Sequence, residues 1–147
     1  MLIEADRHGD HRGFFAEIYS FKKYSKYGID HDFVQDNHSL SQKVGTLRGM
    51  HFQVPPHAQA KLVRCGRGAI FDVAVDIRRG SPNYGCWTGY ELSAANGDQL
   101  YIPIGFAHGF ITLETESEIV YKCSDYYAPE TEGTILWSDP NIGIEWP

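Results

Sequence analysis

Short apolar segments separated by turn-forming residues are the feature that most limits how this chain can fold. The clearest segment covers residues 68–77, where Val73 and Val75 lie on the face opposite Asp72, with the two-residue period of a strand. One short peripheral helix is predicted near residues 20–27. Many short strands at close spacing favour a β-barrel or β-sandwich. Further strands are predicted, with Gly, Pro, Asn and Ser between them, at residues 14–19, 46–52, 61–65, 86–93, 99–103, 108–113 and 117–123.

Composition places the chain among soluble globular proteins. Its 147 residues, 42% of them hydrophobic, predict one domain over residues 1–147 that buries roughly two-thirds of its unfolded surface. No run approaches the roughly 20 apolar residues of a membrane helix, and the N-terminus lacks the pattern of a secretory signal. We therefore expect a cytoplasmic protein with no membrane partner. Cys65, Cys86 and Cys123 are odd in number and widely spaced, which predicts reduced thiols.

Charge narrows the range of partners. The formal net charge of −6 argues against nucleic-acid binding, which requires a basic surface. Basic side chains nevertheless gather within residues 43–79, and acidic ones within residues 114–145. On charge alone, solvated faces of opposite sign explain this pattern best, with a local site for a small anion as the alternative.

One motif points to a barrel interior. Gly97, Pro103, Gly105 and His108 have the spacing of the second conserved box of the cupin superfamily, which presents a histidine after a strand and a Pro-Gly turn. A core histidine with no chemical role is the alternative. The first box of metal-binding cupins resembles H-x-H followed by a carboxylate, whereas this chain offers only His51 in TLRGMHFQ. Two isolated imidazoles rarely hold a metal, so we expect none, and His51 is left free to act as a base.

Several blocks with a shared pattern cover almost the whole chain, at residues 9–17, 33–41, 47–53, 61–65, 70–82, 102–110, 121–133 and 135–147. Together they resemble one family, the metal-free cupin family of dTDP-4-dehydrorhamnose 3,5-epimerases. The resemblance implies an all-β, cupin-type jelly-roll β-barrel with at most one or two short peripheral helices. It also implies a homodimer without a cofactor that epimerises dTDP-4-dehydro-6-deoxy-D-glucose at C3 and C5 to dTDP-4-dehydro-L-rhamnose, in dTDP-L-rhamnose and surface polysaccharide synthesis.

The reaction implied by this resemblance needs three chemical groups. The C4 ketone acidifies the hydrogens at C3 and C5, and inversion requires a base and an acid on opposite faces of the sugar. The resemblance implies that His51 is the base, that Tyr121 is the acid and that Lys61 stabilises the enolate oxygen. Without the family match, the alternative interpretations are that His51 is a core histidine, that Tyr121 is a packing residue and that Lys61 is a surface lysine.

The resemblance also implies residues that bind the substrate. Arg12 and Arg48 match positions that bind the diphosphate, for which guanidinium groups provide paired donors. Tyr127 matches an aromatic residue that stacks near the nucleotide, with the adjacent Tyr126 as the alternative, and His108 matches a residue of the sugar site. Nucleotide or sugar contacts are implied for Glu17, Gln35, Asp36, Asn37 and Glu132, although the Gln-Asp-Asn run is also typical of turns and loops.

Two points of geometry stay open in the sequence. Strand alternation places Arg48 and His51 on opposite faces unless a bulge at Gly49 redirects the chain. Members of the family typically begin before Met1 and continue some thirty residues past Pro147, and that tail carries an aspartate paired with the base. Losing such a partner weakens a histidine base, and nothing in the sequence places a replacement beside His51. The candidates are Asp72, Asp76 and Asp139.

Other functions are compatible with the same residues. Relatives that epimerise only C3 or only C5, or that isomerise the keto group between C3 and C4, share the barrel and its histidines. A non-catalytic barrel that binds a nucleotide sugar is the alternative from another class of protein. Product analysis and proton exchange separate these possibilities.

Overall fold

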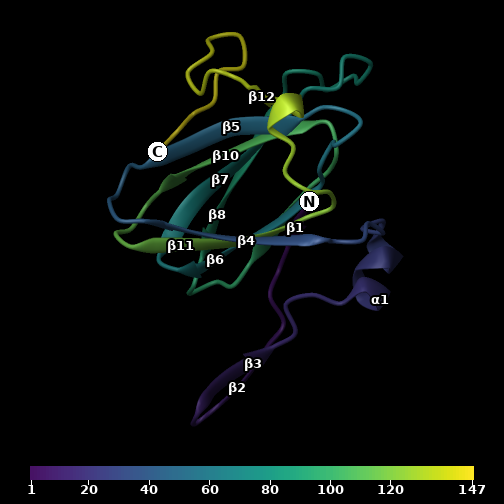
Figure 1. Cartoon of the computed structure of the whole chain (residues 1–147). Helices are drawn as coiled ribbons and strands as arrows, with labels where there is room; N and C mark the ends of the chain where they lie inside the picture. The colour runs from purple at the N-terminus through teal and green to yellow at the C-terminus, as the bar shows by residue number, and fades with distance from the viewer.

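Two five-stranded antiparallel sheets face each other in the computed structural model, which describes residues 1–147 (Figure 1). The first sheet has the order β1 (Leu2–Ile3), β9 (Gln99–Ile102), β6 (Lys61–Arg67), β11 (Ser117–Cys123) and β4 (Gln35–Ser41). The second has the order β12 (Glu132–Thr134), β5 (Leu47–Gln53), β10 (Phe106–Thr112), β7 (Ala69–Asp76) and β8 (Trp87–Ser93). Successive strands from β8 to β12 alternate between the sheets, which confirms the predicted all-β jelly roll.

The remaining elements lie outside the two sheets. A hairpin of β2 (Arg7–Asp10) and β3 (Gly13–Ala16) projects away from the body of the sandwich (Figure 1). The predicted helix is present as α1 (Phe21–Tyr24), followed by the short 3₁₀ turn η1 (Ser25–Tyr27), and a second 3₁₀ turn, η2 (Pro129–Thr131), precedes β12. No helix of the structure has the length and apolar character needed to cross a membrane.

The apolar core between the sheets explains the strand periodicity. Val63 and Cys65 on β6 face Ile70 and Ala74 on β7, within a cluster of nine buried side chains. All three cysteines are free thiols, as the sequence predicts. The interior of the sandwich therefore takes alternate side chains from both sheets.

The other face of β7 is covered by the C-terminal segment. Val73 and Val75 belong to a second buried cluster, against which Ile142 and Trp146 pack. The more apolar face of β7 thus lies outside the barrel, while the face that contains Asp72 lies within it. This orientation leaves room for polar side chains inside the barrel.

Several strands were not predicted from the sequence. They are β1, β2, β4 and β12, of which β4 contains the Gln-Asp-Asn run whose alternative interpretation was a turn. β4 is a strand because it pairs with β11 along its whole length, from Gln35 opposite Cys123 to Ser41 opposite Ser117. Cross-strand pairing overrides the turn preference of asparagine and aspartate here.

Candidate active site

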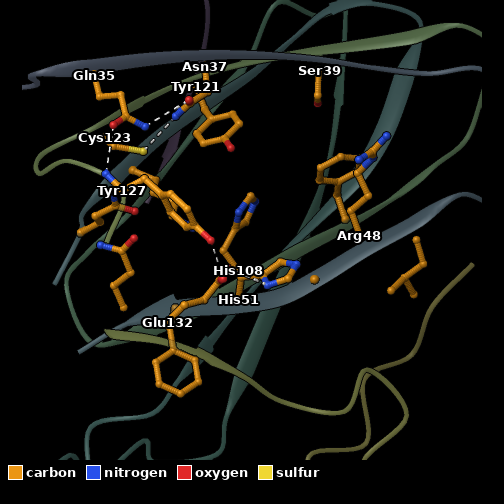
Figure 2. A pocket seen from close by; sticks show the side chains of 17 residues that line it. Gln35, Asn37, Ser39, Arg48, His51, His108, Tyr121, Cys123, Tyr127 and Glu132 are labelled. Atoms are coloured by element: carbon orange, nitrogen blue, oxygen red, sulfur yellow. Dashed lines mark hydrogen bonds and ion pairs between the residues drawn. The ribbon is translucent and has the colours of Figure 1, made fainter. Parts of the chain in front are cut away.

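A pocket of about 670 Å³ lies between the two sheets. Its walls come from β4, β6 and β11 on one side and from β5 and β10 on the other, with side chains after β11 and from β12 closing one end (Figure 2). Most of the residues implied by the family resemblance line this pocket, namely His51, Lys61, Tyr121, Gln35, Asn37, Arg48, His108, Tyr127 and Glu132.

A bulge in β5 brings Arg48 and His51 to the same pocket. His51 is opposite His108 on β10, and Arg48 is opposite Phe110, so two residues of β5 face one of β10. Gly49 lies in this bulge with φ of 122°, and a Cβ there would come within 2.5 Å of the Gly109 Cα. The sequence left a bulge at Gly49 open as the condition for this arrangement, and the structure contains that bulge. Glycine suits this position because it accepts both the conformation and the close approach.

The guanidinium of Arg48 is held at one end of the pocket. Its Nε donates a hydrogen bond to the Ser41 hydroxyl at 3.1 Å, and a terminal nitrogen donates to the Leu40 carbonyl at 3.3 Å. Both acceptors lie at the end of β4. This anchoring leaves a positive charge beside the pocket in a defined position.

His51 has a carboxylate beside it. Its Nδ1 lies 3.3 Å from Glu132 Oε1, and the other oxygen of Glu132 accepts a hydrogen bond from the Tyr127 hydroxyl at 2.9 Å (Figure 2). The pKa of His51 is lowered, chiefly by burial and further by Lys61 and His108, while the charge of Glu132 acts in the opposite direction. The imidazole is therefore set up to be neutral, and so able to accept a proton, near pH 7.

Lys61 and Tyr121 reach the pocket from the first sheet. Burial lowers the pKa of the Lys61 ammonium, and burial raises the pKa of the Tyr121 phenol. The structure records no hydrogen bond from a protein group to either polar tip. A cation, a proton donor and a base thus face one cavity, an arrangement suited to removing and returning a proton beside an oxyanion.

The aspartates considered as partners of His51 lie elsewhere. Asp72 contacts His108 instead, with 2.7 Å between Oδ1 and Nε2, and Asp76 binds the guanidinium of Arg78. Asp139 accepts hydrogen bonds from the backbone and side-chain amides of Asn141 near the C-terminus. The acidic residue that lies beside His51 is Glu132, for which the resemblance implied a substrate contact.

The loop after β11 places the two candidate tyrosines differently. Tyr127 lines the pocket and Tyr126 does not. The Tyr127 backbone N–H donates to Gln35 Oε1 at 3.0 Å, and the Gln53 amide donates to the Tyr126 carbonyl at 3.2 Å. Gln53 therefore fixes this loop, a function that sequence reasoning missed because it depends on a contact between residues far apart in the chain.

One further lining residue could have been found from the sequence. Cys123 follows Tyr121 by two positions and shares its face of β11, and its Sγ accepts a long hydrogen bond of 3.5 Å from the Asn37 side chain. Burial raises the pKa of this thiol. No group of three or more His, Cys, Asp and Glu side chains is arranged to hold a metal, and the metal-free character of the site stays a prediction.

Three of the implied binding residues lie outside this pocket. Asp36 points to the other face of β4, where it pairs with Lys122 at 2.9 Å, because it alternates with Gln35 and Asn37. Arg12 lies at the turn of the projecting hairpin and binds Asp10, and Glu17 pairs with Lys23 at 2.8 Å. Their binding roles stay predictions.

Comparison with known proteins gives close relatives along the whole chain. The dTDP-4-dehydrorhamnose 3,5-epimerase of Salmonella typhimurium is 54% identical over 148 residues, which cover 100% of this chain and 80% of that protein. The crystal structure of the Bacillus anthracis epimerase with TDP and pyrophosphate bound matches with a TM-score of 0.97 and 48% identity, covering 99% of this chain and 83% of that one. The Legionella pneumophila enzyme in complex with dTDP-4-keto-L-rhamnose matches with a TM-score of 0.95 and 50% identity, covering 99% and 77%.

A narrower enzyme shares the same fold. A 3′-monoepimerase from Streptomyces bikiniensis, in complex with dTDP-quinovose, matches with a TM-score of 0.90 and 37% identity, covering 99% of this chain and 74% of that one. The family described as dTDP-4-dehydrorhamnose 3,5-epimerase matches residues 1–147. With its jelly roll, its pocket and these matches, the chain belongs to the dTDP-4-dehydrorhamnose 3,5-epimerase family.

Proposed function

We propose that this protein epimerises dTDP-4-dehydro-6-deoxy-D-glucose at C3 and C5 to give dTDP-4-dehydro-L-rhamnose. The observation that carries the proposal is the convergence of His51, Lys61 and Tyr121 on one pocket from β5, β6 and β11. These groups supply a base, a cation and a proton donor, which are the three elements that the reaction needs.

In each epimerisation a C–H bond next to the C4 ketone breaks and later re-forms. His51 takes the proton, the electron pair of the broken C–H bond forms a C=C bond to C4, and the π electrons of the ketone move to its oxygen. Lys61 stabilises the resulting enolate oxygen. Tyr121 then returns a proton to carbon on the opposite face. Burial supports this assignment, because it lowers the pKa of His51 and raises that of Tyr121, which favours a neutral base and a protonated acid.

The nucleotide part of the substrate binds at the ends of the same pocket. Arg48 faces the diphosphate, for which a fixed guanidinium provides paired donors. Tyr127 offers an aromatic ring for stacking against the base, and Gln35 holds the backbone of this tyrosine in place. The product belongs to dTDP-L-rhamnose synthesis for surface polysaccharide, in the cytoplasm.

The assembly we propose is a homodimer. Arg12 is implied in phosphate binding, yet within one chain it lies on a hairpin that projects away from the barrel (Figure 1). Phe14 and Phe15 on this hairpin are 62% and 71% exposed, which is unusual for two adjacent large apolar side chains. Docking the hairpin on a second copy buries these rings and carries Arg12 toward the pocket of the other subunit.

Proton NMR in D2O with dTDP-4-keto-6-deoxyglucose tests the reaction. The expected result is deuterium at both C3 and C5, together with formation of the L-sugar. Deuterium at one carbon would favour a monoepimerase, the function of the Streptomyces bikiniensis relative. Tight binding of dTDP without exchange at either carbon would indicate a non-catalytic nucleotide-sugar-binding barrel and overturn the proposal.

A further inference from the structure

We propose that Gln53 is a positioning residue for nucleotide binding, because its side-chain amide ties together two loops at one end of the pocket. The first loop covers residues 54–60, between β5 and β6, and the second covers residues 124–128, after β11. We call these two loops together the rim. The inference rests on the proposed function, since it concerns how the same site holds the dTDP part of its substrate.

The Gln53 amide makes hydrogen bonds to both loops of the rim. Its Nε2 donates to the His57 carbonyl at 2.6 Å in the first loop and to the Tyr126 carbonyl at 3.2 Å in the second. Its Oε1 accepts a hydrogen bond from the Ala128 backbone N–H at 3.1 Å. A primary amide has two N–H donors and one carbonyl acceptor, so this side chain matches its three backbone partners.

The position of this amide is fixed by a strand. Gln53 is the last residue of β5, is opposite Glu132 on β12, and is only 8% exposed. The next N–H along the chain, that of Val54, donates to the Thr131 carbonyl at 3.0 Å. Because the amide is buried, water does not readily replace a lost partner, and an unpaired donor or acceptor there is costly.

Other contacts join the two loops along their length. The Gln59 amide donates to the Asp125 carbonyl at 2.7 Å, and His57 Nδ1 lies 3.2 Å from Asp125 Oδ2. The Ala60 N–H donates to the Ser124 hydroxyl at 2.8 Å, and the Ser124 N–H donates to the Ala60 carbonyl at 3.0 Å. The rim is therefore one connected unit, with Gln53 as its link to the second sheet.

Tyr127 is the part of the rim that faces the nucleotide in the proposed function. Gln53 binds the peptide groups on both sides of this residue, the Tyr126 carbonyl and the Ala128 N–H. The Tyr127 N–H itself donates to Gln35 Oε1 at 3.0 Å (Figure 2). The backbone that carries this aromatic ring is therefore held from both sheets, by Gln35 on β4 and by Gln53 on β5.

A rim that is ordered before binding strengthens nucleotide binding. When a ligand has to order a mobile loop, the lost conformational freedom of the loop offsets part of the interaction free energy. The groups of the proposed proton transfer, His51, Lys61 and Tyr121, lie on strands and not in the rim. Loss of the Gln53 hydrogen bonds should therefore weaken nucleotide binding far more than it slows the chemical steps.

Gln53→Met tests the proposal, since methionine has a similar length and makes none of these hydrogen bonds. We expect the Kd for dTDP, measured by isothermal titration calorimetry, to rise about 10-fold. KM should rise in parallel, while kcat changes less than about threefold. Without any ligand, the Ala128 amide should exchange its hydrogen faster in D2O, because it has lost its acceptor.

Gln53→Glu separates the hydrogen bonds of the side chain from its packing. At neutral pH the carboxylate still accepts from Ala128 but faces two loop carbonyls, so dTDP binding should be weakened at least as much as by Gln53→Met. Burial raises the pKa of such a carboxyl, and protonation restores one donor. The ratio of variant to native Kd should therefore fall as the pH falls for Gln53→Glu and stay constant for Gln53→Met. The titratable neighbours His57, Asp125 and Glu132 are present in all three proteins, so the ratio removes their effect.

Ser117→Ala is the matched control for stability. Ser117 is 0% exposed and lies outside the pocket, with its hydroxyl 3.1 Å from the Ala69 carbonyl and 2.9 Å from the Glu114 carbonyl. This variant also loses a buried hydrogen bond, so it should lower the melting temperature and leave the Kd for dTDP unchanged. If it weakens dTDP binding as much as Gln53→Met does, the effect is general destabilisation and the proposal is overturned.

Failure of this inference is distinguishable from failure of the proposed function. If the native chain binds dTDP without exchanging protons, the proposed reaction fails, and weaker binding by Gln53→Met still supports the role of Gln53. If the native chain exchanges protons at both carbons and Gln53→Met binds dTDP equally well, the reaction stands and the role of Gln53 is overturned. A lower kcat with unchanged Kd and KM would also overturn it.

Discussion

His108 and Asp72 form a pair inside the barrel, with 2.7 Å between Nε2 and Asp72 Oδ1. The side chains are 8% and 0% exposed, and the other carboxylate oxygen of Asp72 is buried without a protein partner. The two residues are diagonal neighbours on adjacent strands, since His108 on β10 is opposite Ala74 on β7, two positions from Asp72. The pair therefore fixes the orientation of a histidine that lines the pocket.

Removing one member of this pair should destabilise the fold. We expect Asp72→Ala to lower the free energy of unfolding by about 3 kcal/mol, because it leaves a buried partner without its counterpart. Urea denaturation measures this, with Asp125→Ala as the control, since Asp125 contacts His57 at 3.2 Å in a far more exposed pair whose loss costs about 1 kcal/mol or less. Equal effects of the two substitutions would contradict this prediction.

Substitution of the bulge glycine should affect both stability and binding. Gly49→Ala forces an L side chain to a φ of 122° and against the backbone of β10, which should cost roughly 1 to 3 kcal/mol or more. It should also raise KM, because Arg48 and His51 share the pocket only through this bulge. Gly80→Ala is the control, since a Cβ there meets no atom within 4 Å.

The base and the acid should have separable effects on proton exchange. His51→Asn should abolish deuterium entry at both C3 and C5, because one base serves both carbons. Tyr121→Phe should slow proton return more than proton removal, so the substrate loses its hydrogen faster than product forms. Comparing the rate of deuterium entry with the rate of product formation in D2O measures the difference. Near-normal turnover by His51→Asn would exclude the proposed mechanism.

Replacing Lys61 should lower the activity of the enzyme and raise the stability of its fold. Lys61→Met removes the cation beside the enolate and should lower kcat by about 100-fold to 1000-fold. The same change should raise the melting temperature at neutral pH, since burial lowers the pKa of Lys61 and so disfavours the ammonium in the native state.

The sign of the pH dependence follows from this lowered pKa. The cost of the buried ammonium is complete below the native pKa and disappears above the ordinary value for lysine in the unfolded chain. The stability advantage of Lys61→Met should therefore narrow as the pH rises between these two values. Thermal denaturation at several pH values measures this trend, and an advantage that widens with pH would contradict it.

The hairpin should control assembly. We expect Phe15→Asp to shift the protein from dimer toward monomer, because a charge replaces an apolar ring that docking would bury. Light scattering at assay concentrations measures the shift, and Tyr27→Asp is the control, since Tyr27 is similarly exposed at 72% but lies in η1, outside the hairpin. A native chain that is purely monomeric would refute the proposed dimer.

The sequence predicted the barrel well because its signals are local. Alternation in residues 61–65 and 117–123 identifies strands whose buried side chains, among them Val63 and Ile119, fill the core. β4 and β12 were missed because their residues have weak strand preference, and pairing with β11 and β5 makes them strands. The sequence predicted that one face of β7 is apolar, but it did not predict that the C-terminal segment covers this face.

For the site, the sequence by itself determined which residue types are available and, through motif spacing and family resemblance, which of them belong together. It could also state the condition for Arg48 and His51 to share a face, since strand alternation is a local rule. Only the tertiary structure decided that Glu132 lies beside His51, that Asp72 holds His108, and that Arg12 projects away from the pocket of its own chain. These outcomes depend on strand register and on packing between segments far apart in the sequence, and no periodicity within a single segment contains that information.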